Sequence, residues 1–319
     1  MDITTLIPAY KPKYVRELLA CLRHQTYPSK RILISDDSPN GEFRQELMSE
    51  AHQGLRQRLP IEVIEGPRQG AYANVKHLIR QWNGSSELVH LLFDDDVIYP
   101  EFYQRHLVTH ASAELSCSIS RRWTANENGL PLVVGLPVPP QVSQHPNRLL
   151  MLDSDVVFMT TVAKCENWFG EFSNAVLRAG SCELLLRPEL GGVSYAGIWD
   201  LGFFVNASLR GPVGFIQDHL GFFRVGGSGN SADRMGPFMK GAFLGYTAMA
   251  LGAHRLGRLS REQLLACYRV IGPSLQLDYA EQADMQEFLR ILPALAREEA
   301  GAEERFIQAW TEFQTTHRF

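Results

Sequence analysis

Three consecutive carboxylates, Asp94, Asp95 and Asp96, directly follow the apolar run 88–93. Adjacent negative charges at the end of a buried strand repel one another and raise each other's pKa unless a cation or hydrogen-bond donors compensate. Mg²⁺ takes one or two protein carboxylates and completes its shell with water and phosphate oxygens. The run therefore predicts a divalent-cation site facing a phosphate group. A solvated acidic turn, or an N-cap for the helix near Pro100, is the alternative.

The segments around this run alternate between two kinds of pattern. Short apolar runs favour strands, and segments with apolar residues at helical spacing favour helices. Strands that alternate with helices imply a largely parallel sheet, whose ligands bind beyond the carboxyl ends of the strands. The predicted strands are 3–7, 31–35, 61–64 and 88–93, and the predicted helices are 14–23, 43–55 and 71–82.

The loops after these strands collect the unusual residues of the first half. They are Pro8-Ala9-Tyr10, Asp36-Asp37, the segment 66–70 and the three aspartates. Neither the dinucleotide motif G-x-G-x-x-G after the first strand nor the P-loop motif G-x-x-x-x-G-K-[ST] is present, so a nucleotide needs another means of binding.

Composition narrows the possible functions. The chain has 319 residues, 45% hydrophobic and 21% charged, which excludes disorder, collagen and coiled coil as the main architecture. Its net charge of −4 provides no basic field for nucleic-acid binding. Five cysteines without regular spacing suggest neither a disulfide framework nor a zinc site, and a reducing cytosol fits best.

The expected location is the cytoplasm, and peripheral association with the inner face of the membrane is the alternative. The N-terminus has no basic segment followed by a long apolar one, so it does not resemble a cleaved signal. The most apolar window, 236–254, contains Lys240 and falls short of a membrane span, which favours a buried helix.

The second half predicts further strands and then helices. Short strands are expected around the Asn128-Gly129 turn and within 150–159, and the loop 226–229 could bind a diphosphate or serve as a linker. From residue 237 the pattern is helical, with a capping box at Ser260 and a stop at Gly272. The apolar stripe that includes Phe306, Ile307, Trp310 and Phe313 favours core packing over an interface. His106 and His110 lack the glutamate of H-E-x-x-H, which argues against a metalloprotease.

Five motifs in order resemble family 2 glycosyltransferases with the GT-A fold. They are IPAYK, ILISDDS, EGPRQGAYAN, LLFDDD and the stretch 195–231, so the resemblance covers residues 2–231. It implies a Rossmann-type mixed sheet flanked by helices, in an α/β chain with a C-terminal helical appendage. The implied domains are 1–232, with a nucleotide-binding half 1–100 and an acceptor half 101–232, and the helical region 233–319.

The resemblance also assigns roles around the nucleotide. Pro8, Ala9 and Tyr10 would pack against the nucleoside, Asp36 would accept a hydrogen bond from the base, and Arg68 would cover the base. Asn74 would lie near the nucleotide and Asp94 would face ribose or sugar hydroxyls. Asp95 and Arg224 are further expected contacts of the nucleotide sugar.

The reaction itself is expected to use a metal and a general base. Asp96 would hold Mg²⁺ or Mn²⁺, and His219 would complete the metal shell, touch a phosphate or be structural. Asp200 would be the base, although it could instead cap a helix, which would leave Asp218 or Glu183 as the base.

These assignments describe an inverting, metal-dependent glycosyltransferase of the hexosyl- or deoxyhexosyltransferase class. It would move sugar from a nucleotide-diphosphate sugar to a hydroxyl of a glycan, lipid-linked or protein acceptor, and could form homo-oligomers through its C-terminal helices. Surface-glycan or protein glycosylation would be its role. A nucleotidyltransferase is one alternative, but the loop after the first strand lacks the expected Gly-rich basic signature. A catalytically silent nucleotide-sugar or carbohydrate-binding protein is the other.

Overall fold

The computed structural model describes residues 1–132, 135–226 and 233–319. The chain divides into two compact units, the first made of residues 1–153, 169–187 and 207–225. The second comprises residues 154–168, 188–206 and 226–319. Apart from Gly226, the glycine-rich loop expected at 226–229 lies outside the described residues.

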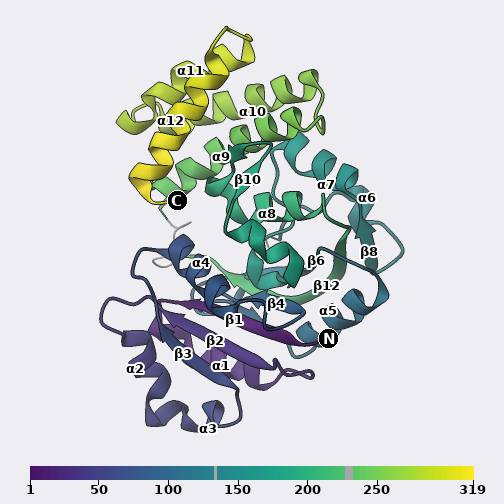
Figure 1. Ribbon diagram of the computed structural model, residues 1–319, viewed down its shortest axis with the longest axis vertical. Helices are drawn as coiled ribbons and strands as arrows, with labels where there is room; N and C mark the ends of the chain where they lie inside the picture. The colour runs from purple at the N-terminus through teal and green to yellow at the C-terminus, as the bar shows by residue number, and fades with distance from the viewer. Residues whose placement is uncertain (133–134, 227–232) are drawn as a thin grey trace. The chain divides into compact units, whose positions relative to one another are not determined.

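Within the described residues, ten strands of the first unit form one mixed sheet (Figure 1). The order is β3-β2-β1-β4-β9-β6-β12-β5, with β7 beside β6 and β8 beside β12. Strands β3, β2, β1 and β4 run parallel to one another, as their alternation with helices predicted. β12 is also parallel to β6, whereas β4–β9, β6–β9, β6–β7, β12–β8 and β12–β5 are antiparallel. The strands are β1 Ile3–Ala9, β2 Arg31–Asp36, β3 Ile61–Glu65, β4 Leu88–Leu91, β5 Val97–Ile98, β6 Cys117–Ala125, β7 Pro131–Leu132, β8 Leu149–Leu152, β9 Ala175–Arg178 and β12 Val213–Arg224.

Helices of the first unit flank this sheet, which confirms the expected α/β class. Apolar residues spaced along α1 give it one buried face, and this face shares a core with side chains of β1 and β2. Phe43 and Leu47 of α2 and Phe102 and Tyr103 of α5 belong to the same core. The helices are α1 Val15–Arg23, α2 Glu42–Met48, α3 Gln53–Arg56, α4 Ala71–Trp82, α5 Phe102–Ser112 and α6 Pro140–Ser143.

Two predicted elements of the first half differ from the structure. The single helix expected over 43–55 is broken, because Ser49 is extended and ends α2 before a 3₁₀ turn at 50–52 and the short α3. The apolar stretch 150–159 is strand only to Leu152 and then becomes helix α7 (Ser154–Thr160). Its apolar residues fit either structure, because a short apolar run has no diagnostic period.

The second unit is mainly helical, as expected after residue 237. It contains α7, the hairpin β10 (Glu189–Leu190) with β11 (Val193–Ser194), and α8 (Trp199–Ala207), whose last residue falls in the first unit. The long helices are α9 Pro237–Arg255, α10 Arg261–Tyr279, α11 Gln286–Ala296 and α12 Ala302–His317. Phe306, Trp310 and Phe313 are buried inside this unit, which supports the core-packing interpretation of the stripe.

Helix α10 confirms one boundary prediction and contradicts another. Ser260 forms the expected capping box with Gln263. The helix does not stop at Gly272 but continues through Pro273, because Leu275 and Tyr279 extend its buried face into the core. Packing of that face therefore outweighs the lost backbone hydrogen bond.

Helix α9 is the apolar window that was expected to be buried. Most of its small residues are buried, and Gly252 lies so near β10 that a Cβ there would approach Leu190 O to 2.1 Å. Among the described residues, no helix has the length and apolar character needed to cross a membrane.

Candidate active site

The loops after β1 and β4 meet because these strands are parallel neighbours, with Leu6 opposite Leu91. Asp94 Oδ2 accepts hydrogen bonds from the backbone N–H of Tyr10 at 2.5 Å and of Lys11 at 2.6 Å. Burial, with a contribution from Asp95, raises the pKa of Asp94 to about 7, although the two N–H donors oppose this rise. One oxygen of Asp94 is therefore committed to shaping the loop after β1.

Asp95 has a different partner. Its carboxylate forms a salt bridge with the Lys11 side chain. Burial alone would lower the pKa of Lys11, but attraction to Asp95 outweighs it and the pKa is raised. Tyr10 beside them remains 55% exposed, so its ring is available to a ligand.

Asp96 is only 2% exposed and has unused bonding capacity. Its Oδ1 accepts a hydrogen bond from Arg224 N at 3.1 Å, whereas the buried Oδ2 has no partner within hydrogen-bond geometry among the described residues, and the nearby Ser173 side chain only opposes the rise in the pKa of the carboxyl. Burial and then the charge of Asp95 raise its pKa well above the usual value. A buried carboxylate oxygen without a partner is costly, and a bound cation would remove that cost.

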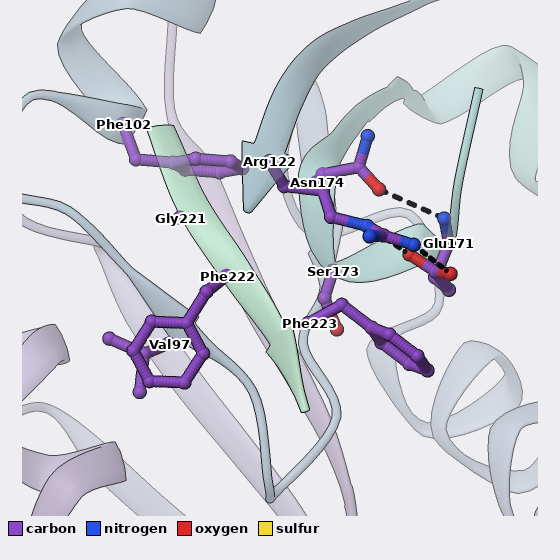
Figure 2. A pocket seen from close by; sticks show the side chains of 9 residues that line it. All are labelled: Val97, Phe102, Arg122, Glu171, Ser173, Asn174, Gly221, Phe222 and Phe223. Carbon is purple, nitrogen blue, oxygen red and sulfur yellow. Dashed lines mark hydrogen bonds and ion pairs between the residues drawn. The ribbon is translucent and has the colours of Figure 1, made fainter. Parts of the chain in front are cut away.

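A polar cluster lies next to Asp96, with Glu171 adding to its negative surroundings. Figure 2 shows Arg122 held by Glu171 through two nitrogens, at 2.9 and 2.6 Å, with Asn174 accepting from Glu171 N at 2.9 Å. The cavity that these residues and Ser173 line measures about 10 Å³, room for one water molecule. Composition and spacing gave no signal for this cluster, because its residues come from distant segments.

The role expected of Asp36 does not match its contacts. Asp36 Oδ1 accepts from Ser38 N at 2.9 Å and Ser38 Oγ at 2.5 Å, and its Oδ2 accepts from Arg44 N at 2.9 Å. Both oxygens thus hold the turn into α2. A carboxylate that satisfies the first N–H groups of a helix acts as a cap, so Asp36 has a structural task.

Its neighbour Asp37 points toward the segment expected to cover the base. Asp37 accepts hydrogen bonds from the backbone N–H groups of Arg68 and Gly70, and burial raises its pKa despite them. Gly66 is required here, because a Cβ would lie 2.7 Å from Asp37 Oδ1. The sequence singled out Arg68 but missed the carboxylate that shapes its loop.

Asn74, Arg224 and His219 are also engaged within the protein. Asn74 Nδ2 donates to Ser35 O at 3.1 Å and ties α4 to β2. Arg224 is buried and bonded to groups around the acidic run. His219 stacks on Trp123 with ring centres 3.9 Å apart, a contact that fits the structural alternative for this residue.

The candidate bases differ in their surroundings. Asp200 is half-buried in the first turn of α8, in the second unit. Asp218 forms ion pairs with Arg105 and Arg148, which lower its pKa although burial alone would raise it. Glu183 pairs with Arg210 at 2.7 Å.

Comparisons with known proteins show the family and the fold. The model for glycosyl transferase family 2 matches residues 4–163. Structural similarity, with a TM-score of 0.57 at 15% identity, extends to S. aureus TarS in complex with UDP-GlcNAc, over 100% of this chain and 92% of that one. A mannosyltransferase from Pyrobaculum calidifontis in complex with GDP-Man and Mn²⁺ gives 0.54 at 14% identity, over 99% and 86%. Both share the fold. A search of curated proteins found no match.

Proposed function

The chain belongs to glycosyl transferase family 2 and is a glycosyltransferase; from that premise we propose an inverting, metal-dependent transfer. Sugar would move from a nucleotide-diphosphate sugar to a hydroxyl of a glycan, lipid-linked or protein acceptor. The neighbours bound to UDP-GlcNAc and to GDP-Man make a hexosyl donor the first class to test. Residues 1–232 would carry catalysis, in surface-glycan or protein glycosylation.

One observation carries this proposal: the unpartnered, buried Oδ2 of Asp96 in the acidic loop, as we call residues 94–96. An oxygen ligand suits Mg²⁺ or Mn²⁺. No group of three His, Cys, Asp or Glu residues able to hold a metal occurs in the described part of the chain. Asp96 would therefore hold the ion together with diphosphate oxygens and water, as is usual for Mg²⁺. When bound, the ion supplies Lewis-acid stabilisation of the departing diphosphate.

The other residues would place the donor beside Asp96. The loop after β1 is fixed by Asp94, and the exposed ring of Tyr10 would pack against the nucleoside. The loop that Asp37 holds would present the Arg68 side chain to the base. In this proposal Asp36 caps the turn into α2, and His219 stays stacked on Trp123.

Asp200 would take the proton from the acceptor hydroxyl as that oxygen attacks the anomeric carbon. It lies in the first turn of α8, at the positive end of the helix dipole. Asp218, which pairs with Arg105, and Glu183, which pairs with Arg210, are the other candidates. A single displacement of this kind inverts the configuration of the sugar.

The test is a panel of nucleotide sugars, with acceptor sugars and lipid-linked acceptors, assayed for transfer with Mn²⁺ and with EDTA. Asp96→Asn and Asp200→Asn are compared with Asp218→Asn as the matched control. Transfer that requires Mn²⁺, gives inverted product and is lost in the first two variants supports the proposal. Equal transfer with EDTA, or retained configuration, contradicts it.

A further inference from the structure

Arg224, the last residue of β12, joins three separate segments of the first unit. Its backbone N–H donates to Asp96 Oδ1 at 3.1 Å, and its Nε donates to the Asp95 carbonyl oxygen at 2.8 Å. Its Nη1 donates to Glu127 O at 2.7 Å, and its Nη2 donates to Glu17 Oε2 at 2.6 Å. All three guanidinium nitrogens are thus engaged within the protein, on a side chain that is almost fully buried.

The acceptors of these hydrogen bonds show whether Arg224 acts on the backbone of the acidic loop or on its carboxylates. The guanidinium bonds to the backbone carbonyl of Asp95, whose carboxylate is neutralised by Lys11 instead. Its own ion pair is with Glu17 on α1, and it also lies 4.4 Å from the centre of the Tyr14 ring. Arg224 therefore fixes the backbone of the acidic loop, and among the described residues its salt bridge is with Glu17 and not with the three carboxylates of that loop.

We propose that Arg224 is a positioning residue, which holds the acidic loop so that Asp96 Oδ2 stays available to the cation. We assign this role in place of contact with the donor because the side chain of Arg224 is only 2% exposed and each of its three nitrogens donates to a protein acceptor. The expected effect of replacing Arg224 on sugar transfer rests on the proposed function, whereas the expected effect on the order of the acidic loop does not.

The test uses Arg224→Lys and Arg224→Gln in the full chain. Lysine keeps the charge, but its compact ammonium cannot span three acceptors that a planar guanidinium reaches together. Arg178→Lys is the matched control, because Arg178 also donates to backbone carbonyls, those of Leu115 and His110, both at 3.4 Å.

Hydrogen exchange measures the order of the loop without any substrate. The amides of Tyr10 and Lys11, which donate to Asp94, should exchange roughly 10- to 100-fold faster in both Arg224 variants, the effect of losing one charge-assisted hydrogen bond. The amides of β2 report global opening and should change much less, and Arg178→Lys should match the wild type. Unchanged exchange at Tyr10 and Lys11, or an equal rise at β2, overturns the proposal.

Transfer assays then test the consequence for the cation. Arg224→Lys should need roughly 10-fold more Mn²⁺ for half-maximal transfer, again the effect of about one hydrogen bond, whereas Arg178→Lys should not. A wild-type Mn²⁺ response in Arg224→Lys overturns the proposal. Faster exchange in a protein that transfers no sugar from any donor supports the positioning role and rejects the proposed function.

Discussion

His90 links the strand before the acidic loop to the segment that contains Ser173. It is fully buried on β4, with Nε2 at 3.0 Å from Ser173 O and Nδ1 at 3.0 Å from Tyr103 Oη. A carbonyl oxygen can only accept, so Nε2 carries a proton. The tyrosine hydroxyl also lies 2.6 Å from Thr5 Oγ1, whose own proton is donated to Ser29 Oγ at 2.9 Å. Burial of the ring without a carboxylate partner among these contacts favours the neutral imidazole.

The neutral, buried imidazole makes the free energy of unfolding depend on pH. Burial lowers the pKa of His90 to about 3, against an ordinary value of 6.5, although the hydrogen bond to Ser173 O opposes this. Below pH 6.5 the His90 imidazole binds a proton in the unfolded chain but not in the folded chain. The contribution of His90 to the free energy of unfolding is therefore fully present above pH 6.5 and is lost as pH falls toward 3. At 1.36 kcal/mol for each pKa unit, the loss between pH 7 and pH 5 is about 2 kcal/mol.

Urea unfolding of His90→Gln and the wild type at pH 7 and pH 5, both with EDTA, measures this contribution. Glutamine can donate and accept but does not titrate, so the variant should lose about 2 kcal/mol less than the wild type over this interval. The absolute stability of the variant does not enter the comparison. His24→Gln, which removes an exposed imidazole, is the control. The same loss in His90→Gln and the wild type would refute the argument.

Three further predictions concern the proposed reaction. Asp96→Asn should remove the Mn²⁺ dependence of nucleoside diphosphate binding while leaving the fold intact, and equal calorimetric affinities with EDTA and Mn²⁺ in the wild type would contradict the metal role. Asp36→Asn should lower the free energy of unfolding by about 1–2 kcal/mol, the range of a lost cap, with nucleotide Kd unchanged; a weaker Kd in a fully stable protein would return Asp36 to the binding site. Asp200→Asn should lower kcat by about 10²- to 10⁴-fold, the usual range for a general base, with donor Kd unchanged, and near-wild-type turnover would exclude Asp200.

The sequence predicted the parallel half of the sheet well, because alternation of apolar runs and helical spacing is a local signal. It also identified the acidic loop, since three adjacent carboxylates are visible without a fold. Gly272 misled the helix prediction, because the packing that carries α10 past it depends on residues of other helices. The local sequence pattern shows the periodicity of a helix, but it does not show which face of that helix another helix or strand will pack against.

The contacts of the expected site residues inside the protein have a related origin. Asp36 and Asp37 are adjacent and chemically identical, and only the path of the backbone decides that Asp36 caps α2 while Asp37 holds the 66–70 loop. The aromatic ring of Trp123, far away in sequence, likewise determines the place of His219. The sequence identifies residue types that are able to bind a ligand. Only the three-dimensional structure shows which protein groups already bond to or stack on those residues.

The acidic loop shows how one fold gives three identical side chains different tasks. Backbone N–H groups hold Asp94, a lysine neutralises Asp95, and Asp96 receives one N–H and keeps one oxygen unpaired. Had each carboxylate met its own cation, none would have capacity left for a divalent ion. In the described part of the chain, the guanidinium of Arg224 donates to the Asp95 carbonyl and to Glu17 and not to the Asp96 carboxylate. Asp96 is therefore the carboxylate of the acidic loop that keeps an oxygen for a cation. The affinity for a cation then depends as much on what the neighbouring residues do not neutralise as on the aspartate itself.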